Sequence, residues 1–339
     1  MRKIFLGAIL VFGLTNCSET ENLTLSQELD ELADSFQIFT IMNEKTDTIK
    51  TKSGVKIITR PNTFMQSDRQ DAKEPILIEL QEVFDKSEMI LNGIGTVSNG
   101  KLLESFGMVF IKAMSDGEEL TLKNDMPITI SIPNKREGYN GELFYGTKTS
   151  DGLNWEYTGP KSDTIVVETI EEVKGGIEIV RVKTYAITNG LKVLISDTNQ
   201  GLNYDSISTG EFEMKPFESY QFEITKLGWI NCDRFINIVD KSTLEVELKN
   251  FSHPIGYLIF SNLNSVTGIM FDEQGVALIE ELPDGYPVEL VVIDKMKDKF
   301  FWVKKSLVNG SDARVILKTK AIDKKELKKE LKKLAIGRT

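Results

Sequence analysis

The chain has 339 residues and a formal net charge of −10, and 40% of its residues are hydrophobic. This hydrophobic content is that of a folded protein, and the acidic balance excludes nonspecific binding to nucleic acid, which needs a basic surface. The length exceeds what one hydrophobic core serves, so we expect more than one domain. One histidine and two cysteines cannot supply the ligands of an ordinary structural zinc site.

The first 17 residues have the pattern of a lipoprotein signal peptide. Arg2 and Lys3 form a charged start, and an uncharged apolar run of 11 residues extends from Ile4 to Leu14. This run is too short to span a bilayer, which takes about 20 residues, and fits the apolar part of a secretory signal. The segment Leu14-Thr15-Asn16-Cys17 resembles a bacterial lipobox, at whose cysteine a lipoprotein is cleaved and acylated.

The lipobox resemblance implies that Cys17 carries a lipid anchor, palmitate included, and that the protein belongs to the cell envelope. Asn16 replaces the small residue usual before the cysteine, so an ordinary cleaved signal is the alternative. Ser18 is not the aspartate associated with inner-membrane retention. By analogy we expect the outer membrane, with the protein facing the periplasm or the cell exterior.

A tether and a short helix are expected over residues 18–46. Leu25, Leu29, Leu32 and Phe36 recur at helical spacing, and Ser26 is the predicted N-cap. We expect this helix to dock on the domain that follows, with binding to a partner as the alternative.

From about residue 47 the pattern is that of short strands. Ile76, Ile78 and Leu80 alternate with other residues, as in a half-buried strand. Turn signals that favour hairpins recur at Asn92-Gly93, Asn99-Gly100, Asp116-Gly117, Asn140-Gly141 and Asp151-Gly152. The sequence therefore predicts an all-β fold, a multi-domain antiparallel β-sandwich architecture with short N- and C-terminal helices.

Residues 54–133 resemble the ZU5-like domains of exported Bacteroidetes proteins. The resemblance rests on the segments 52–57, 103–113 and 128–133, and residues 227–235 look like a segment found downstream in such proteins. It implies a β-sandwich without catalytic content. Some eukaryotic ZU5 domains cleave themselves at His-Phe-Ser, but the only histidine here is His253, in another order and another domain, so self-cleavage is not implied.

The expected organisation has six parts. They are a lipoprotein signal peptide over 1–17, a tether and short helix over 18–46, a ZU5-like β-sandwich domain over 47–160, a second β-rich domain over 161–238, a C-terminal β-domain over 239–320 and a basic helix over 321–339.

In the C-terminal helix, the segment from Asp323 to Glu326 has the form of a capping box, and Leu327, Leu331 and Leu334 mark one face. We expect those leucines to dock the helix; contact of its lysine face with anionic lipid headgroups is the alternative.

Few residues indicate chemistry. Cys232 lies in an apolar stretch and is expected to be a buried inert thiol, and His253 is expected in a turn or at a strand end. Oxygen-bearing residues from Asp197 to Asp205 suggest a calcium loop only weakly, because the distal glutamate of such loops is missing. The aromatic residues Tyr139, Phe144, Tyr145, Trp155 and Tyr157 are expected in the core, with a sugar- or peptide-binding platform as the alternative.

The sequence thus favours a noncatalytic envelope lipoprotein that binds or scaffolds partners at the membrane surface. The expected partners are the membrane, through Cys17, and an envelope protein or a glycan, with no cofactor, no metal and no nucleic acid. The alternative is a carboxylate-dependent enzyme that processes carbohydrate or hydrolyses another substrate. A strongly perturbed carboxylate pair in a cleft would favour the enzyme, and an exposed apolar or aromatic patch without such a pair would favour the binding protein.

Overall fold

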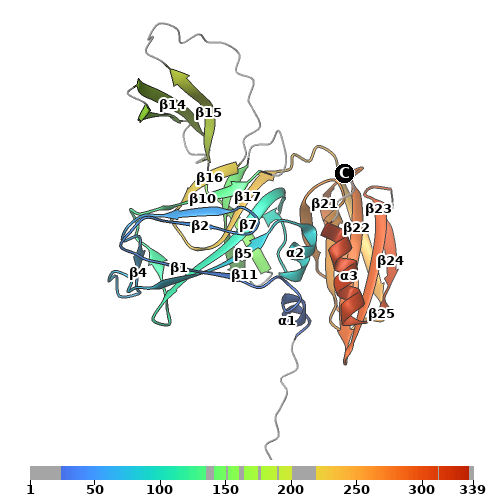
Figure 1. Ribbon diagram of the computed structural model, residues 1–339. Coiled ribbons are helices and arrows are strands. Elements are labelled where there is room, and N and C mark those ends of the chain that lie inside the picture. The colour runs from blue at the N-terminus through green and yellow to red at the C-terminus, as the bar shows by residue number, and fades with distance from the viewer. Residues whose placement is uncertain are drawn as a thin grey trace, which may run out of the picture.

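The computed structural model describes residues 24–134, 141–149, 152–159, 219–311 and 313–335, together with the backbone of three strands between residues 164 and 200. Cys17 and the rest of the leader lie outside the described residues. The described part consists mainly of antiparallel strands with three short helices, which confirms the expected all-β, sandwich-like architecture (Figure 1).

The N-terminal sandwich is formed by two sheets that share one apolar core. The first sheet has the order β1 (Gln37–Ile41), β5 (Ile76–Val83), β7 (Lys101–Ser115), β17 (Gly228–Phe235), β11 (Glu142–Thr149) and β12 (Gly152–Tyr157), with β6 (Val97–Ser98) and β8 (Glu118–Glu119) paired to β7. The second sheet has the order β13 (Thr164–Lys174), β14 (Ile177–Thr188), β15 (Leu191–Gln200), β16 (Ser219–Ile224), β10 (Ile128–Pro133), β3 (Lys56–Thr59) and β2 (Asp47–Lys50). A separate two-stranded ladder joins β4 (Phe64–Met65) to β9 (Thr121–Leu122).

Period-two alternation explains these strands. In β10, Ile128, Ile130 and Ile132 are buried between the two sheets, and the residues between them are only half-buried. Because successive side chains of a strand point to opposite faces, this pattern fixes which face of β10 meets the core.

The turn signals that lie wholly within the described residues had two kinds of outcome, whereas Asn140 and Asp151 lie outside them. Asn99-Gly100 and Asp116-Gly117 have positive φ at both residues and join β6 to β7 and β7 to β8, as expected for tight hairpins. Asn92-Gly93 instead ends a helix: Asn92 is the C-cap of α2 (Lys86–Leu91), and only Gly93 has positive φ. The end of a helix, like a tight hairpin turn, often requires a residue with positive φ, and glycine adopts that conformation readily.

Strand pairing crosses the boundary expected at residue 161. β16 pairs with β10 in the second sheet, and β17 lies between β7 and β11 in the first sheet. Residues 219–235 therefore complete the sheets of the N-terminal sandwich. In Figure 1, β14 and β15 project from this sandwich beyond β16.

The C-terminal sandwich has a third and a fourth sheet around a second apolar core. The third sheet has the order β21 (Val276–Pro283), β18 (Lys241–Lys249) and β24 (Arg314–Lys318), in which β18 and β24 are parallel. The fourth sheet has the order β20 (Ser265–Ile269), β19 (Ile255–Phe260), β22 (Pro287–Met296), β23 (Lys299–Val308) and β25 (Lys320–Ile322).

A helical layer lies between the two sandwiches. It contains α1 (Leu25–Asp30), α2 and α3 (Lys324–Ala335), whose apolar faces share one core with the first and fourth sheets. In α3, Leu327, Leu331 and Leu334 are all buried, as the docked-helix prediction requires, and the Asp323 carboxylate accepts a hydrogen bond from the Glu326 amide at 2.8 Å.

α1 differs from its prediction at both ends. Its N-cap is Thr24, not Ser26, and Thr24 forms a capping box with Gln27. The helix ends at Asp30, so Leu25, Leu29 and Leu32 are buried as expected while Phe36 is 46% exposed. Phe36 instead immediately precedes β1 and joins a different surface.

Candidate functional site

Cys232 and its neighbour Asp233 are both fully buried in β17. Burial raises the pKa of the Cys232 thiol, and the carboxylates of Asp233 and Glu142 add to this effect. A Cβ atom at Gly141 would lie 2.3 Å from the Cys232 sulfur, so the thiol is tightly enclosed. Reactive cysteines have a lowered pKa and partial exposure, so the environment of Cys232 is that of a packing residue.

A polar cluster surrounds Asp233 at the junction of the two sandwiches. Ser105 Oγ donates to Asn231 Oδ1 at 3.0 Å, and Asn231 Nδ2 donates to Asp233 Oδ2 at 2.5 Å, while Asp233 Oδ1 has no hydrogen-bond partner. Glu104 lies beside them and accepts two hydrogen bonds from Arg234, at 2.9 and 2.6 Å. Burial raises the pKa of Asp233 well above its usual value, and the negative charge of Glu104 contributes.

At the same junction, side chains form hydrogen bonds that connect the N-terminal sandwich to the C-terminal sandwich. Asn264 Nδ2 donates to the carbonyl oxygens of Phe84 and Ser105, each at 3.0 Å. The buried ammonium of Lys86 donates to the carbonyls of Phe260 and Ser261. Asp233 is 0% exposed and Glu104 is 3% exposed, so these two carboxylates are enclosed by structure and do not line a cleft. Its geometry is that of a joint between domains.

His253 lies in a loop at the start of β19, next to a hollow of about 650 Å³ that Phe251, Pro254 and Phe271 also line. Its Nδ1 atom is 3.0 Å from Ser252 Oγ. Asp294 is close by, but its carboxylate accepts hydrogen bonds from the backbone amides of Ser252 and His253, at 2.7 and 3.1 Å, and not from the imidazole ring. In a Ser-His-Asp triad the aspartate orients the ring, so this arrangement holds a loop in place.

The aromatic residues expected in the core divide between the core and the edge of the first sheet. Phe144 and Trp155 are fully buried in the layer between the sandwiches, which confirms core packing for them, and Tyr145 and Tyr157 are partly buried. Tyr139 lies outside the described residues. So does the second half of the possible calcium loop, of which only the backbone of residues 197–200 in β15 is described. In the described part of the chain, no group of His, Cys, Asp or Glu residues could hold a metal ion.

An exposed apolar surface does exist, on the outer face of the first sheet. It consists of Phe36, Ile38, Leu77, Phe110 and Trp229, and is called the aromatic face below. The rings of Phe36 and Phe110 meet edge to face with centroids 5.9 Å apart, and those of Phe110 and Trp229 are 5.3 Å apart. Phe36, Ile38 and Leu77 are 46%, 66% and 42% exposed, whereas Phe110 and Trp229 are half-buried.

Strand register explains why these residues share one face. Ile38 pairs with Glu79, which pairs with Lys112, and two residues along β7, Phe110 pairs with Trp229. Residues two apart on a strand point to the same side, so the four strands present one surface. Glu79 and Lys112 lie within it and form an ion pair at 3.9 Å. β1 is the outermost strand of the sheet, and its free edge has no strand partner among the described residues.

Sequence reasoning did not predict the aromatic face. The leucine spacing places Phe36 on the helix, and Trp229 lies more than 100 residues from Phe110 along the chain. The available signal was the alternation in β7, where Phe110, Lys112 and Met114 are half-buried while Val109, Ile111 and Ala113 are buried. An aromatic residue on the solvent side of an alternating strand indicates such a surface.

Comparison of the chain with protein-family models, curated proteins and solved structures found no match. None of the helices in the described part of the chain is long and apolar enough to cross a membrane.

Proposed function

We propose that this chain is a noncatalytic lipoprotein of the cell envelope, anchored through Cys17, that binds a protein partner through its aromatic face. The aromatic face is the observation that carries the binding role. Its composition, with aromatic rings beside Ile38 and Leu77, is that of the apolar centre of a protein interface.

A protein partner suits this surface better than a glycan. A small-ligand site needs several polar groups that converge on the ligand, and two charged groups that the register places within the face, Glu79 and Lys112, pair with each other. The exposed edge of β1 also offers backbone groups to which an extended segment of a partner could add as a strand.

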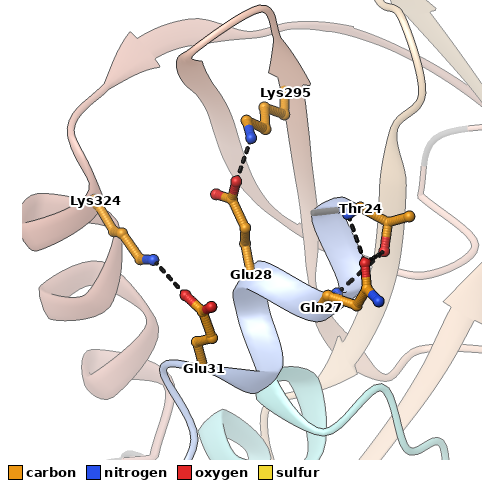
Figure 2. A network of polar contacts seen from close by, with 6 residues as sticks. All are labelled: Thr24, Gln27, Glu28, Glu31, Lys295 and Lys324. Atoms are coloured by element: carbon orange, nitrogen blue, oxygen red, sulfur yellow. Dashed lines mark hydrogen bonds and ion pairs between the residues drawn. The ribbon is translucent and has the colours of Figure 1, made fainter. Parts of the chain in front are cut away.

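The anchor is proposed from the leader and the lipobox-like segment that ends at Cys17. α1 attaches the start of the described chain to the C-terminal sandwich. Glu28 pairs with Lys295 on β22, and Glu31 pairs with Lys324 on α3 at 3.0 Å (Figure 2). The ZU5-like character of residues 54–133 stays a prediction from resemblance.

The partner test uses cross-linking in intact envelopes. The variant Ile38→Asp/Leu77→Asp places two charges on the aromatic face. Met270→Asp/Leu278→Asp is the matched control, because these side chains are 75% and 60% exposed on the C-terminal sandwich. We expect a specific cross-linked protein to be lost from the first variant and kept in the second. Equal cross-linking in both variants would contradict a role for the aromatic face.

The anchor has its own test. Cys17→Ser should remove the acylation site, so the protein should leave the membrane fraction or stay unprocessed. Mass spectrometry of the wild-type N-terminus should show a diacylglyceryl cysteine. Unchanged processing and membrane retention of the variant would count against the anchor.

A further inference from the structure

α3 has two faces of opposite character. At 100° per residue, Lys325, Lys329 and Lys332 lie about half a turn from the leucines of the same helix. The leucines are buried, and these three lysines are exposed. Docking of α3 therefore does not hide its lysines but presents them to the outside.

The charge of this region extends beyond the helix. A hydrogen bond from Lys333 lowers the pKa of the Glu330 carboxyl on α3, and the nearby charges of Lys304 on β23 and Lys320 on β25 contribute. Between residues 320 and 333 there are seven lysines against three acidic residues, in a chain whose net charge is −10. The basic surface is defined here as Lys320, Lys325, Lys328, Lys329 and Lys332.

The basic surface lies close to the point where the chain leaves toward Cys17. Lys324, at the first turn of α3, pairs with Glu31 just after the end of α1 (Figure 2). α1 has six residues and is about 9 Å long. Seven residue steps separate Cys17 from Thr24, and they reach at most about 25 Å when fully extended.

We propose that the basic surface lies against the anionic lipid headgroups of the membrane that holds Cys17. This inference rests on the proposed anchor, which keeps the surface within reach of that membrane. The acidic balance of the whole chain does not oppose it, because salt screens charges beyond about 8–10 Å. Only the local excess of lysine then faces the headgroups, and each basic residue near an anionic surface adds to the attraction.

The test measures vesicle binding by the chain from Ser18 to Thr339, which carries no lipid. Vesicles of phosphatidylglycerol mixed with phosphatidylethanolamine are compared with vesicles of phosphatidylcholine by co-sedimentation. We expect binding to the anionic vesicles only, weakening as salt rises. Lys325→Glu/Lys329→Glu/Lys332→Glu should lower the partition coefficient at least about tenfold.

The control is Lys45→Glu/Lys50→Glu/Lys56→Glu, which makes the same change of charge at exposed lysines in and around β2 and β3, in the second sheet. It should bind as the wild type does, and thermal unfolding should show that both variants are folded. Absence of binding to anionic vesicles, or an equal loss in both variants, would overturn the proposal. Because the measurement uses unacylated protein, this result is independent of the Cys17→Ser experiment.

Discussion

Asp233 is a fully buried carboxyl group, and its burial makes the stability of the fold depend on pH. Its pKa is raised well above 3.8, first by burial and then by the nearby charge of Glu104, although the polar side chains of Ser105 and Asn231 act against the shift. A group whose pKa is raised on folding stabilises the fold fully below its unfolded pKa. That contribution is lost as the pH rises from 3.8 through the folded pKa.

Asp233→Asn keeps the shape of the side chain and cannot ionise. We expect the free energy of unfolding of this variant, relative to the wild type, to increase as the pH rises from about 4 to about 7. Urea unfolding at a series of pH values measures this difference. Asp116→Asn, in an exposed turn, is the control and should follow the wild type; parallel curves for all three proteins would contradict the prediction.

Among the elements, α3 depends on its leucines. Leu331 is fully buried in the layer between the sandwiches, and replacing such a leucine by alanine leaves a cavity. We expect Leu331→Ala to lower the free energy of unfolding by about 2–5 kcal/mol in urea titrations. Lys329→Ala, on the opposite face, should change it by less than about 0.5 kcal/mol. If Leu331→Ala lowered the free energy of unfolding by less than about 1 kcal/mol, the leucine contacts would not be what holds the helix.

The two ion pairs of α1 should differ in strength. The side chains of Glu28 and Lys295 are 14% and 18% exposed, whereas those of Glu31 and Lys324 are 52% and 44% exposed. An exposed pair contributes about 0.2–1 kcal/mol, and removing one partner of a desolvated pair costs more. Hydrogen exchange of the α1 amides should therefore speed up clearly in Glu28→Gln and only slightly in Glu31→Gln. The reverse order would show that Glu28 is solvated in solution.

Local patterns predicted local structure well in this chain. The leucine spacing of α3, the alternation of β10 and the hairpins at Asn99 and Asp116 all depend on neighbours within a few residues, and the structure contains each of them. The partner of a strand depends instead on segments far away. No local signal indicated that β17 lies between β7 and β11, or that β18 pairs in parallel with β24.

The candidate site was missed for the same reason. The aromatic face combines side chains from four strands, and Phe36 continues a leucine spacing that is helical only as far as Asp30. By contrast, the buried state of Cys232 followed from its apolar neighbours alone. A surface made by sheet register can be derived only when the strand order is known, whereas burial of one residue is encoded locally.

At the scale of the whole molecule, the N-terminal sandwich depends on residues beyond the boundary at 160. Without β17, the pair β11–β12 would lose its connection to β7, and the core would lose Ile230 and Cys232. The core would also lose Tyr220, Phe222 and Ile224, which β16 contributes. Sheet pairing of this kind is non-local, so the strands before residue 160 cannot replace what is missing.

We therefore expect a fragment of residues 36–160 to lack a cooperative thermal transition, while a fragment of residues 36–238 shows one. Both contain β1, and both lack the C-terminal sandwich, so they differ only in residues 161–238, which include β16 and β17. Circular dichroism during heating distinguishes the two outcomes, because a chain without a complete core unfolds gradually. Cooperative unfolding of the shorter fragment would show that residues up to 160 form an independent domain and that β17 only adds to it.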